Sequence, residues 1–256
     1  MDLHLSGKTA VVTGASRGIG LAVTRTLVAE GMRVVGAART ITTELEETGA
    51  IPVSADLSTA EGVGRLVDEA SVIDVLVNNV GGGDDVDLGG FLSLDDAHWR
   101  ENFDVNFYSA LRVTRAALPS LIDRRGAIVN VSSAGARVPS GGPVAYNVAK
   151  AALTALSKAL AEEFGPRGVR VNTVSPGPVR TSIWESADGF GGKLAANAGV
   201  DLPDFLEQVP EMMGMTTGRI AEPEEVAALI AYLASDRARS VCGADYAING
   251  GLIKTA

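Results

Sequence analysis

Residues 9–20 read Thr9-Ala10-Val11-Val12-Thr13-Gly14-Ala15-Ser16-Arg17-Gly18-Ile19-Gly20, and this stretch decides the fold. It joins a short apolar, β-rich run to a glycine-rich turn, and the helical pattern of residues 21–28 follows directly. Such a turn lets backbone N–H groups and the positive end of the helix approach a dinucleotide pyrophosphate, because the missing side chains remove the steric barrier. Glycines also make ordinary turns. The strand before this turn and the helix after it favour the nucleotide-binding interpretation.

The same alternation of strand and helix patterns continues to the end of the chain. Capping patterns mark helix starts at Ser58-Thr59-Ala60-Glu61 and at Pro223, which precedes Glu224 and Glu225. Parallel strands separated by helices require right-handed crossovers, so we predict an α/β fold with a Rossmann-like, doubly wound parallel seven-stranded sheet. Helices on both faces complete a three-layer α/β/α sandwich. The expected strands are Thr9–Thr13, Arg33–Ala37, Ile51–Ala55, Val72–Val77, Gly126–Val131, Val169–Val174 and Asp245–Ile248.

Length and composition fit one folded unit. The chain has 256 residues, of which 46% are hydrophobic, and this content suits parallel strands that are buried on both faces. No linker or internal repeat interrupts the pattern, so we expect a single domain over residues 1–256. The formal net charge is −9. Nucleic-acid binding needs a basic surface, so we expect no nucleic-acid partner, and we interpret the acidity as favouring solubility.

A few residue types bear on compartment and metal chemistry. Cys242, the single cysteine, cannot form an internal disulfide, which fits a reducing compartment. Residues 1–8 lack the apolar core of a signal peptide and no run reaches membrane-spanning length, so we expect a cytoplasmic protein with no membrane partner. His4 and His98 have no second ligand at metal-binding spacing, so no metal site is expected.

Tyr146 and Lys150 form a second chemical pattern, Tyr146-Asn147-Val148-Ala149-Lys150, which Ser132 and Ser133 precede at the end of an apolar run. Four residues span one helical turn, so an ammonium beside the phenol would stabilise the phenolate and lower a tyrosine pKa of about 10. Such a phenol can protonate an alkoxide or deprotonate an alcohol. The spacing also arises by chance on amphipathic helices. The glycine-rich turn elsewhere in the chain favours the catalytic interpretation.

The chain resembles the classical short-chain dehydrogenase/reductase family from about Gly7 to Gly251. The glycines of residues 14–20 follow the family's G-x-x-x-G-x-G spacing and not the older dinucleotide fingerprint. Val80 stands where the family usually has alanine, and Asn249 stands where it usually has an acid. The matching residues, in the family's order, are Gly14, Gly18, Gly20, Asp56, Asn78-Asn79-Val80-Gly81, Asn106, Ser133, Tyr146, Lys150 and Pro176-Gly177.

The resemblance implies one role for each of four catalytic residues. Tyr146 would transfer the proton as general acid or base, and Ser133 would donate a hydrogen bond to the substrate oxygen. Lys150 would lower the tyrosine pKa and hold the nicotinamide ribose. Asn106 would hold a water that connects Lys150 to solvent, and Ser132 would then be structural.

The resemblance also implies the contacts of a dinucleotide cofactor. Asp56 would accept from the adenine amino group, and Pro176 and Gly177 would form the turn beneath the nicotinamide. Val179 and Thr181 would hold its carboxamide. In full, the expected cofactor contacts are Gly14, Ser16, Arg17, Gly18, Ile19, Gly20, Arg39, Thr40, Asp56, Leu57, Asn79, Gly81, Tyr146, Lys150, Pro176, Gly177, Val179 and Thr181.

Charge at the end of the second strand predicts which cofactor is used. NAD-binding folds of this type place an acid there, whereas this sequence reads Ala38-Arg39-Thr40, with Glu44 as the nearest downstream acid. Arg39, together with Arg17 in the glycine-rich turn, can pair with a 2′-phosphate. We therefore predict NADP(H) as the cofactor. The alternative is that both arginines are solvated surface groups.

Residues 182–218, called the lid segment below, depart from the alternating pattern, and the family places its mobile substrate lid here. The apolar residues of this segment either suit an apolar or aromatic ketone or anchor the lid to the body. Arg137, close to the active segment, leaves a carboxylate or thioester-linked substrate open as well. We expect residues 81–90 to form an active-site loop. Pro139, Val144 and the bend of residues 141–143 are expected to form a further wall. The apolar lid residues are Trp184, Phe190, Leu194, Leu202, Phe205, Met212, Met213 and Met215.

Three functions remain open at this point. The favoured one is an NADPH-dependent oxidoreductase that reduces a ketone or other carbonyl to a secondary alcohol, with Tyr146 as general acid/base. The second is an NADP-dependent alcohol dehydrogenase working in the oxidative direction. The third is a non-catalytic NADPH sensor, which would have no chemical need of the four catalytic residues. The expected partner is a small carbonyl or alcohol substrate, and the resemblance implies a homotetramer or homodimer.

Overall fold

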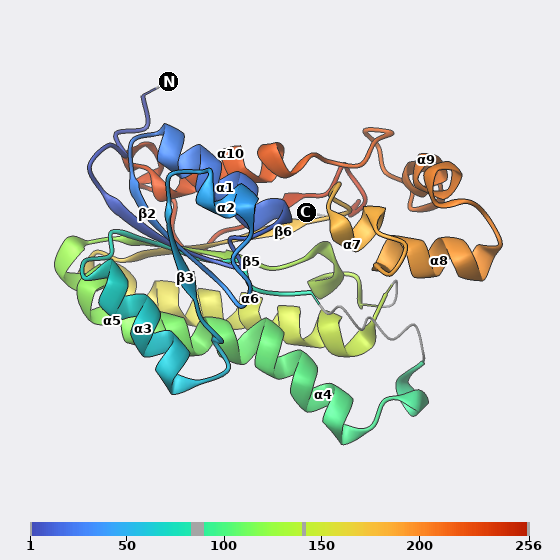
Figure 1. Ribbon diagram of the computed structural model, residues 1–256, viewed down its shortest axis with the longest axis horizontal. Helices are drawn as coiled ribbons and strands as arrows, with labels where there is room; N and C mark the ends of the chain where they lie inside the picture. Colours follow the sequence, from blue (N-terminus) through green and yellow to red (C-terminus); the bar gives the residue numbers. More distant parts are fainter. Residues whose placement is uncertain (1, 83–89, 140–141, 255–256) are drawn as a thin grey trace.

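A seven-stranded sheet lies at the centre of the computed structural model, which describes residues 2–82, 90–139 and 142–254 (Figure 1). Its strand order is β3-β2-β1-β4-β5-β6-β7, and the recorded strand pairs are parallel. The chain reverses its direction of winding between β1 and β4, as a doubly wound sheet requires. The predicted Rossmann-like sheet is therefore confirmed. The strands are β1 (Thr9–Thr13), β2 (Arg33–Ala38), β3 (Ile51–Ser54), β4 (Val75–Asn78), β5 (Ala127–Val131), β6 (Arg170–Pro176) and β7 (Asp245–Ile248).

The observed strands differ from the predicted ones at their ends. β4 begins at Val75 and not at Val72, because Val72 is exposed and the Ile73 N–H donates to Ser120 Oγ at 2.8 Å instead of joining the sheet. β6 continues past the predicted end to Pro176, because its pairing with β7 extends to that residue. The turn expected beneath the nicotinamide therefore begins on the last residue of a strand.

Helices cover both faces of the sheet (Figure 1). Val12 of β1 packs in the apolar cluster that includes α1 and α10, and its neighbour Val11 packs in the cluster that includes α3 and α5. Alternate residues of one strand thus enter different cores, which is the predicted three-layer arrangement. The helices are α1 (Gly18–Ala29), α2 (Thr43–Glu46), α3 (Ala60–Ala70), α4 (Asp96–Phe103), α5 (Ser109–Arg124), α6 (Val144–Phe164), α7 (Ser182–Glu185), α8 (Phe190–Ala198), α9 (Leu202–Met212) and α10 (Pro223–Ala234). Shorter turns are η1 (Phe91–Ser93), η2 (Asp104–Tyr108), η3 (Ala134–Ala136), η5 (Gly165–Arg167) and η6 (Asp236–Ala238).

Two helices begin where the capping patterns of the sequence place them. Thr59 precedes α3, and its Oγ1 accepts from the Gly62 N–H at 3.0 Å. α10 begins at Pro223, and the Glu225 carboxylate reaches back to accept from the Glu222 N–H at 2.8 Å. Both contacts satisfy N–H groups that the first helical turn leaves unpaired.

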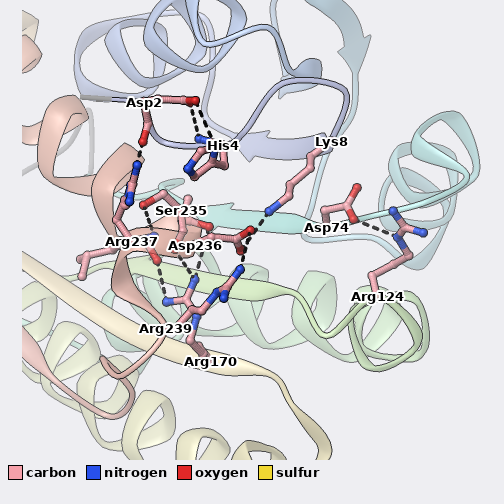
Figure 2. Close-up of polar contacts among 12 residues, drawn as sticks. Asp2, His4, Lys8, Asp74, Arg124, Arg170, Ser235, Asp236, Arg237 and Arg239 are labelled. Atoms are coloured by element: carbon pink, nitrogen blue, oxygen red, sulfur yellow. Dashed lines mark hydrogen bonds and ion pairs between the residues drawn. The ribbon is translucent and has the colours of Figure 1, made fainter.

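Polar contacts tie the first residues of the chain to the segment after α10 (Figure 2). Lys8 Nζ donates to the Asp236 carboxylate at 3.1 Å, and Arg237 Nε donates to the Asp2 carbonyl at 2.9 Å. Arg170 donates to carbonyl groups in the last turn of α10, including Leu233 at 2.8 Å, so a guanidinium caps that helix. Lys8 and Arg170 lie at the amino ends of β1 and β6, so these contacts stabilise the edge of the sheet opposite its carboxyl ends.

The lid segment forms α7, α8 and α9 at one end of the molecule (Figure 1). It has a small core of its own, where Phe205 is buried and Trp184 meets Phe190 edge-on with ring centroids 5.2 Å apart. Met215 is buried too, whereas Met212 is 57% exposed. Most of the apolar lid residues therefore anchor this segment. Residues 83–89 of the expected active-site loop, and residue 141 of the expected wall, lie outside the described residues.

Candidate functional site

The glycine-rich turn lies against the end of β4. Gly14 has a φ of +66°, in the left-handed region, and a Cβ there would lie 3.0 Å from Asn79 Nδ2. A Cβ on Gly20 would lie 2.5 Å from the same atom. Because side chains are excluded here, the backbone N–H groups at the start of α1 stay accessible to a phosphate. The turn therefore fits the pyrophosphate of a dinucleotide.

Asn79 and Thr13 hold that turn in place. Asn79 Nδ2 donates to the carbonyl groups of Thr13 at 3.1 Å and Gly14 at 3.2 Å. Thr13 Oγ1 accepts from the backbone N–H groups of Asn79 at 2.9 Å and Val80 at 3.1 Å. Thr13 is not among the cofactor residues expected from the sequence. Its signal is a hydroxyl at the last strand position before the glycines.

Thr181 and Gly177 approach the turn from the carboxyl end of β6. A Cβ on Gly18 would lie 3.0 Å from Thr181 Cγ2, so the two predicted cofactor segments adjoin. A Cβ on Gly177 would lie 2.9 Å from Asn249 Cα, so only glycine lets these backbones approach so closely. Val179 is buried and bridges to Ala221. A pocket of about 260 Å³ opens beside Gly18 and Thr181, and its other lining residues are Arg17, Leu21, Ala22, Arg25, Arg180, Ser182, Pro223 and Glu224.

Arg39 and Asp56 follow neighbouring strands, β2 and β3. The Ser58 N–H donates to Asp56 Oδ1 at 2.9 Å, and this bond holds the pKa of Asp56 below its usual value, with a smaller contribution from the Arg39 charge. Leu57 is buried beside them. Arg17 lines the pocket next to Thr181, so the structure groups it with the lid-side residues and places Arg39 with Asp56.

The turn after β2 is tied to the glycine-rich turn. Thr42 Oγ1 donates to the Ser16 carbonyl at 3.1 Å, and Thr40 is exposed in the same turn. Ile19 is partly buried at the start of α1, where it packs against the core. The Thr42 hydrogen bond therefore links the turn after β2 to the glycine-rich turn.

Ser133, Tyr146 and Lys150 meet at the carboxyl end of β5. The Ser133 side chain is close enough to Tyr146 to influence the pKa of the phenol, and Ser133 Oγ accepts from the Gly135 N–H at 3.1 Å. This bond uses a lone pair of the serine hydroxyl and leaves its proton for another acceptor. Lys150 Nζ donates to the Val131 carbonyl at 3.0 Å and lies 5.8 Å from the centroid of the Tyr146 ring.

Burial dominates the pKa values of this pair. It raises the pKa of the Tyr146 phenol above its ordinary value of 10.0, and the interaction with the Ser133 side chain offsets only part of the rise. Burial also lowers the pKa of Lys150 to about 8. Lys150 does not offset the rise in the tyrosine pKa in this arrangement, because the amine is itself desolvated and donates to Val131. Tyr146 is consequently a neutral phenol, and so a proton donor, at neutral pH.

Asn106 lies in η2, a π-helical turn between α4 and α5. Such turns are rare and often occur at functional sites. Asn106 Oδ1 accepts from the Gly82 N–H at 2.9 Å, and its Nδ2 donates to the Asn102 carbonyl at 3.0 Å. A Cβ on Gly81 would lie 2.5 Å from Lys150 Nζ and 3.0 Å from Asn106 Oδ1. The structure therefore brings Asn106 and Gly81 to the same site as Lys150.

Known proteins are similar to this one along nearly the whole chain. Residues 14–253 match a family model described as enoyl-(acyl carrier protein) reductase. The 3-oxoacyl-[acyl-carrier-protein] reductase FabG of Escherichia coli (strain K12) is 34% identical, over 98% of this chain and 99% of that protein. The chain belongs to the short-chain dehydrogenase/reductase family. It is thus an NAD(P)-dependent oxidoreductase.

Solved structures of this family superpose on the whole chain. L-sorbose reductase from Gluconobacter frateurii, complexed with NADPH and L-sorbose, has a TM-score of 0.91 at 32% identity, covering 100% of both chains. Aldohexose dehydrogenase from Thermoplasma acidophilum, in ligand-free form, has a TM-score of 0.88 at 28% identity, covering 100% of this chain and 98% of that one. The family prediction made from the motifs is confirmed.

Other polar residues near the motifs of this short-chain dehydrogenase/reductase hold its framework. Ser132 Oγ donates to the Lys150 carbonyl at 3.0 Å. Asn78 is buried, and its Nδ2 donates to a side-chain oxygen on β5 at 2.8 Å. Asn147, which the sequence analysis did not single out, donates from Nδ2 to the Pro139 carbonyl at 3.0 Å. Each of these side chains therefore links a catalytic segment to a neighbouring element.

Arg137 is engaged within the protein. Its Nη2 lies 2.8 Å from the Asp245 carboxylate on β7. The guanidinium is therefore paired, which removes the reason to expect a substrate carboxylate at this position.

Across residues 2–82, 90–139 and 142–254, no group of three or more His, Cys, Asp or Glu side chains is arranged to hold a metal ion. No helix in the described part of the chain combines the length and apolar character needed to cross a bilayer.

Proposed function

We propose that this protein is an NADPH-dependent carbonyl reductase that converts a ketone or other carbonyl to a secondary alcohol. The observation that supports it is the link between the two halves of the site through residues 79–81. Asn79 holds the glycine-rich turn, and Gly81 adjoins Lys150, which follows Tyr146 by one turn of α6. The glycine-rich turn and the proton donor Tyr146 are thus connected through residues 79–81.

In this proposal the protein's residues act on the carbonyl oxygen. Bound NADPH supplies the hydride for the carbonyl carbon. The Ser133 hydroxyl donates a hydrogen bond that orients the carbonyl, and the Tyr146 O–H gives its proton to the same oxygen as negative charge develops there. Lys150 and Asn106 both adjoin Gly81. In this proposal they line the route by which a proton from solvent returns to Tyr146.

The same proposal assigns the cofactor contacts. Backbone N–H groups of residues 14–20 would hold the pyrophosphate, and Asp56 would accept from the adenine amino group. Arg39 would pair with the 2′-phosphate, which supports NADPH over NADH because no carboxylate follows β2 in this position. Lys150 would hold the nicotinamide ribose and Thr181 the carboxamide.

Protonation of Tyr146 supports the reductive direction. A phenol whose pKa lies above 10.0 is ready to donate at neutral pH, whereas alcohol oxidation requires the phenolate. An NADP-dependent alcohol dehydrogenase would therefore work at alkaline pH. The reductive direction is the one that we propose at neutral pH.

Charge on the lid segment supports an uncharged substrate. This segment contains one basic residue, Lys193, and six acidic residues. The six acidic side chains are exposed. A negative potential around the lid would disfavour carboxylates and phosphorylated carriers on approach. We therefore propose a neutral carbonyl compound. The six acids are Glu185, Asp188, Asp201, Asp204, Glu207 and Glu211.

Residues 1–256 would work as one catalytic unit that assembles as a homodimer or homotetramer. Phe103, Phe107 and Tyr108 form an aromatic cluster near the start of α5, and Tyr108 is 43% exposed. An exposed aromatic side chain on a long helix is suited to contact a second copy. Sedimentation velocity measures the assembly state directly.

A cofactor oxidation assay tests the proposed function. The purified protein is given NADPH with a panel of neutral ketones, matched keto acids and acyl thioesters, and kcat/KM is compared with that for NADH. We expect turnover of neutral ketones and a higher kcat/KM with NADPH. Tight NADPH binding without turnover of any carbonyl compound would favour the sensor instead, and equal values for the two cofactors would remove the assignment of Arg39.

A further inference from the structure

Arg137 and Asp245 form an ion pair between positions 108 residues apart. Arg137 Nε donates to Asp245 Oδ2 at 3.0 Å, Nη2 lies 2.8 Å from the same oxygen, and Nη2 also donates to the Asp245 backbone carbonyl at 2.9 Å. Ser175 Oγ on β6 donates to the remaining carboxylate oxygen at 2.7 Å. The carboxylate is therefore bound on both sides, and the guanidinium contacts both backbone and side chain of β7.

The pair is shielded from solvent more than most surface ion pairs. The side chain of Arg137 is 32% exposed and that of Asp245 is 16% exposed. Multiple charge-assisted hydrogen bonds in fixed geometry hold a position more firmly than a single exposed contact does. This pair can therefore restrain the segment from which Arg137 projects.

That segment contains the proposed substrate-orienting serine. Ser133 begins the η3 turn and accepts from the Gly135 N–H, and Arg137 ends the same turn. Two residues later, the Pro139 carbonyl accepts from Asn147 Nδ2 on α6. The stretch from Ser133 to Pro139 is thus held to β7 at Arg137 and to α6 at Pro139.

We propose that Arg137 and Asp245 are positioning residues for Ser133, and this inference rests on the proposed carbonyl reduction. Neither side chain is assigned a contact with substrate or cofactor. The pair fixes the η3 turn so that the Ser133 hydroxyl meets Tyr146 and the carbonyl oxygen together. Breaking the pair misplaces the hydroxyl but leaves the glycine-rich turn intact, because that turn is held by Thr13 of β1 and by Asn79, which follows β4.

Kinetics of single and double variants test the proposal. Arg137→Gln and Asp245→Asn should each lower kcat about tenfold, because small displacements of an orienting group have effects of this size. The dissociation constant for NADPH should change less than about twofold. The double variant should lose no more than either single variant, because both changes break the same pair. Arg137→Lys keeps one charged contact, so its kcat should lie between those of Arg137→Gln and the unmodified protein. It replaces Arg137→Gln in the test if that variant does not fold.

Arg65→Gln is the matched control. It breaks the exposed pair between Arg65 and Glu61 on α3, at 2.9 Å, and should leave kcat unchanged. If the Arg137 and Asp245 variants lose thermal stability but keep the kcat of the unmodified protein, the pair is structural and the proposal is overturned. Additive losses in the double variant would overturn it as well.

A spectroscopic measurement separates this proposal from the proposed function. With carbon-labelled tyrosine, the resonance of the Tyr146 carbon bonded to oxygen is assigned by its loss in Tyr146→Phe. Arg137→Gln should shift this resonance at neutral pH as the Ser133 hydroxyl is displaced from the phenol, whereas Arg65→Gln should not. If the resonance shifts but the protein reduces no carbonyl compound, the positioning role of the pair stands and the proposed reductase function is rejected. An unchanged resonance and unchanged kcat in an active reductase would reject the pair alone.

Discussion

Lys150 Nζ lies 5.8 Å from the centroid of the Tyr146 ring and gives its hydrogen bond to the Val131 carbonyl. Lys150 is buried and Tyr146 is partly buried, so desolvation shifts the pKa of each group toward its neutral form. Burial raises the pKa of Tyr146 and lowers that of Lys150 to about 8. The protein therefore stores its proton on the phenol at neutral pH, with a titratable amine one helical turn away.

Removal of the phenol oxygen should stop the reaction without weakening cofactor binding. Tyr146→Phe keeps the ring but deletes the proton donor, so kcat should fall about 10³-fold, within the range of general acid–base contributions. The NADPH dissociation constant should change less than about twofold. Steady-state assays and fluorescence titration measure the two quantities. A variant that retains more than about a tenth of the turnover would show that the proton comes from another group.

The buried amine should lower the stability of the protein. Because the pKa of Lys150 falls from 10.5 unfolded to about 8 folded, the charged form is disfavoured in the folded state at pH 7. Lys150→Met should therefore abolish turnover yet raise the free energy of unfolding by on the order of 1–3 kcal/mol. The gain should be complete below pH 8 and should vanish as pH rises from about 8 to 10.5, where the unfolded lysine also loses its proton.

Urea denaturation at pH 7 and near pH 10 measures this difference. Lys158→Met on the same helix is the control, because Lys158 is 60% exposed and pairs with Glu162 at 3.6 Å. It should change stability by less than about 0.5 kcal/mol at either pH. A Lys150→Met variant that is less stable than the unmodified protein at pH 7 would show that the contact with Val131 outweighs the burial of the charge.

The sequence was sufficient for the fold because the same signals repeat in every βα unit. Apolar runs such as residues 9–13 become strands buried on both faces, and residues such as Thr59 and Pro223 mark helix starts. The sequence signals do not define where each strand begins and ends. Val72 is as apolar as its neighbours, and only the contact of Ile73 with Ser120 shows that β4 begins later.

The site was predictable in its members but not in its electrostatics. The spacing in the sequence correctly places Lys150 one helical turn after Tyr146. The direction of both pKa shifts depends on how deeply the side chains are buried, and the spacing carries no information about burial. The π-helical turn around Asn106 also has no marker in the sequence, because its shape follows from contacts to Gly82 and Asn102. The role of the apolar lid residues likewise depended on which of them pack against each other.

Gly81 should tolerate no side chain. A methyl group there would lie 2.5 Å from Lys150 Nζ and 3.0 Å from Asn106 Oδ1, so Gly81→Ala must displace the amine. We expect kcat to fall about tenfold, with folding stability within about 1 kcal/mol because the displaced atom ends a flexible side chain. Gly64→Ala on α3 is the control, since a Cβ at Gly64 would meet no atom of the described residues within 4 Å. Equal kcat in both variants would mean that the amine has room to move without affecting the reaction.

Arg39 should set the preference between the two cofactors. Its guanidinium follows β2, near Asp56, where a 2′-phosphate would lie in the proposed complex. A hydrogen bond to a charged group contributes about 1.5–3 kcal/mol, so Arg39→Asp should lower kcat/KM for NADPH about 10- to 100-fold. The new carboxylate can accept from the ribose hydroxyls, so kcat/KM for NADH should hold or rise. Arg167→Asp, the same charge change in the η5 turn, should leave the ratio of the two values unchanged. If Arg39→Asp also leaves that ratio unchanged, the preference is set elsewhere, and Arg17 in the pocket beside Thr181 becomes the residue to replace.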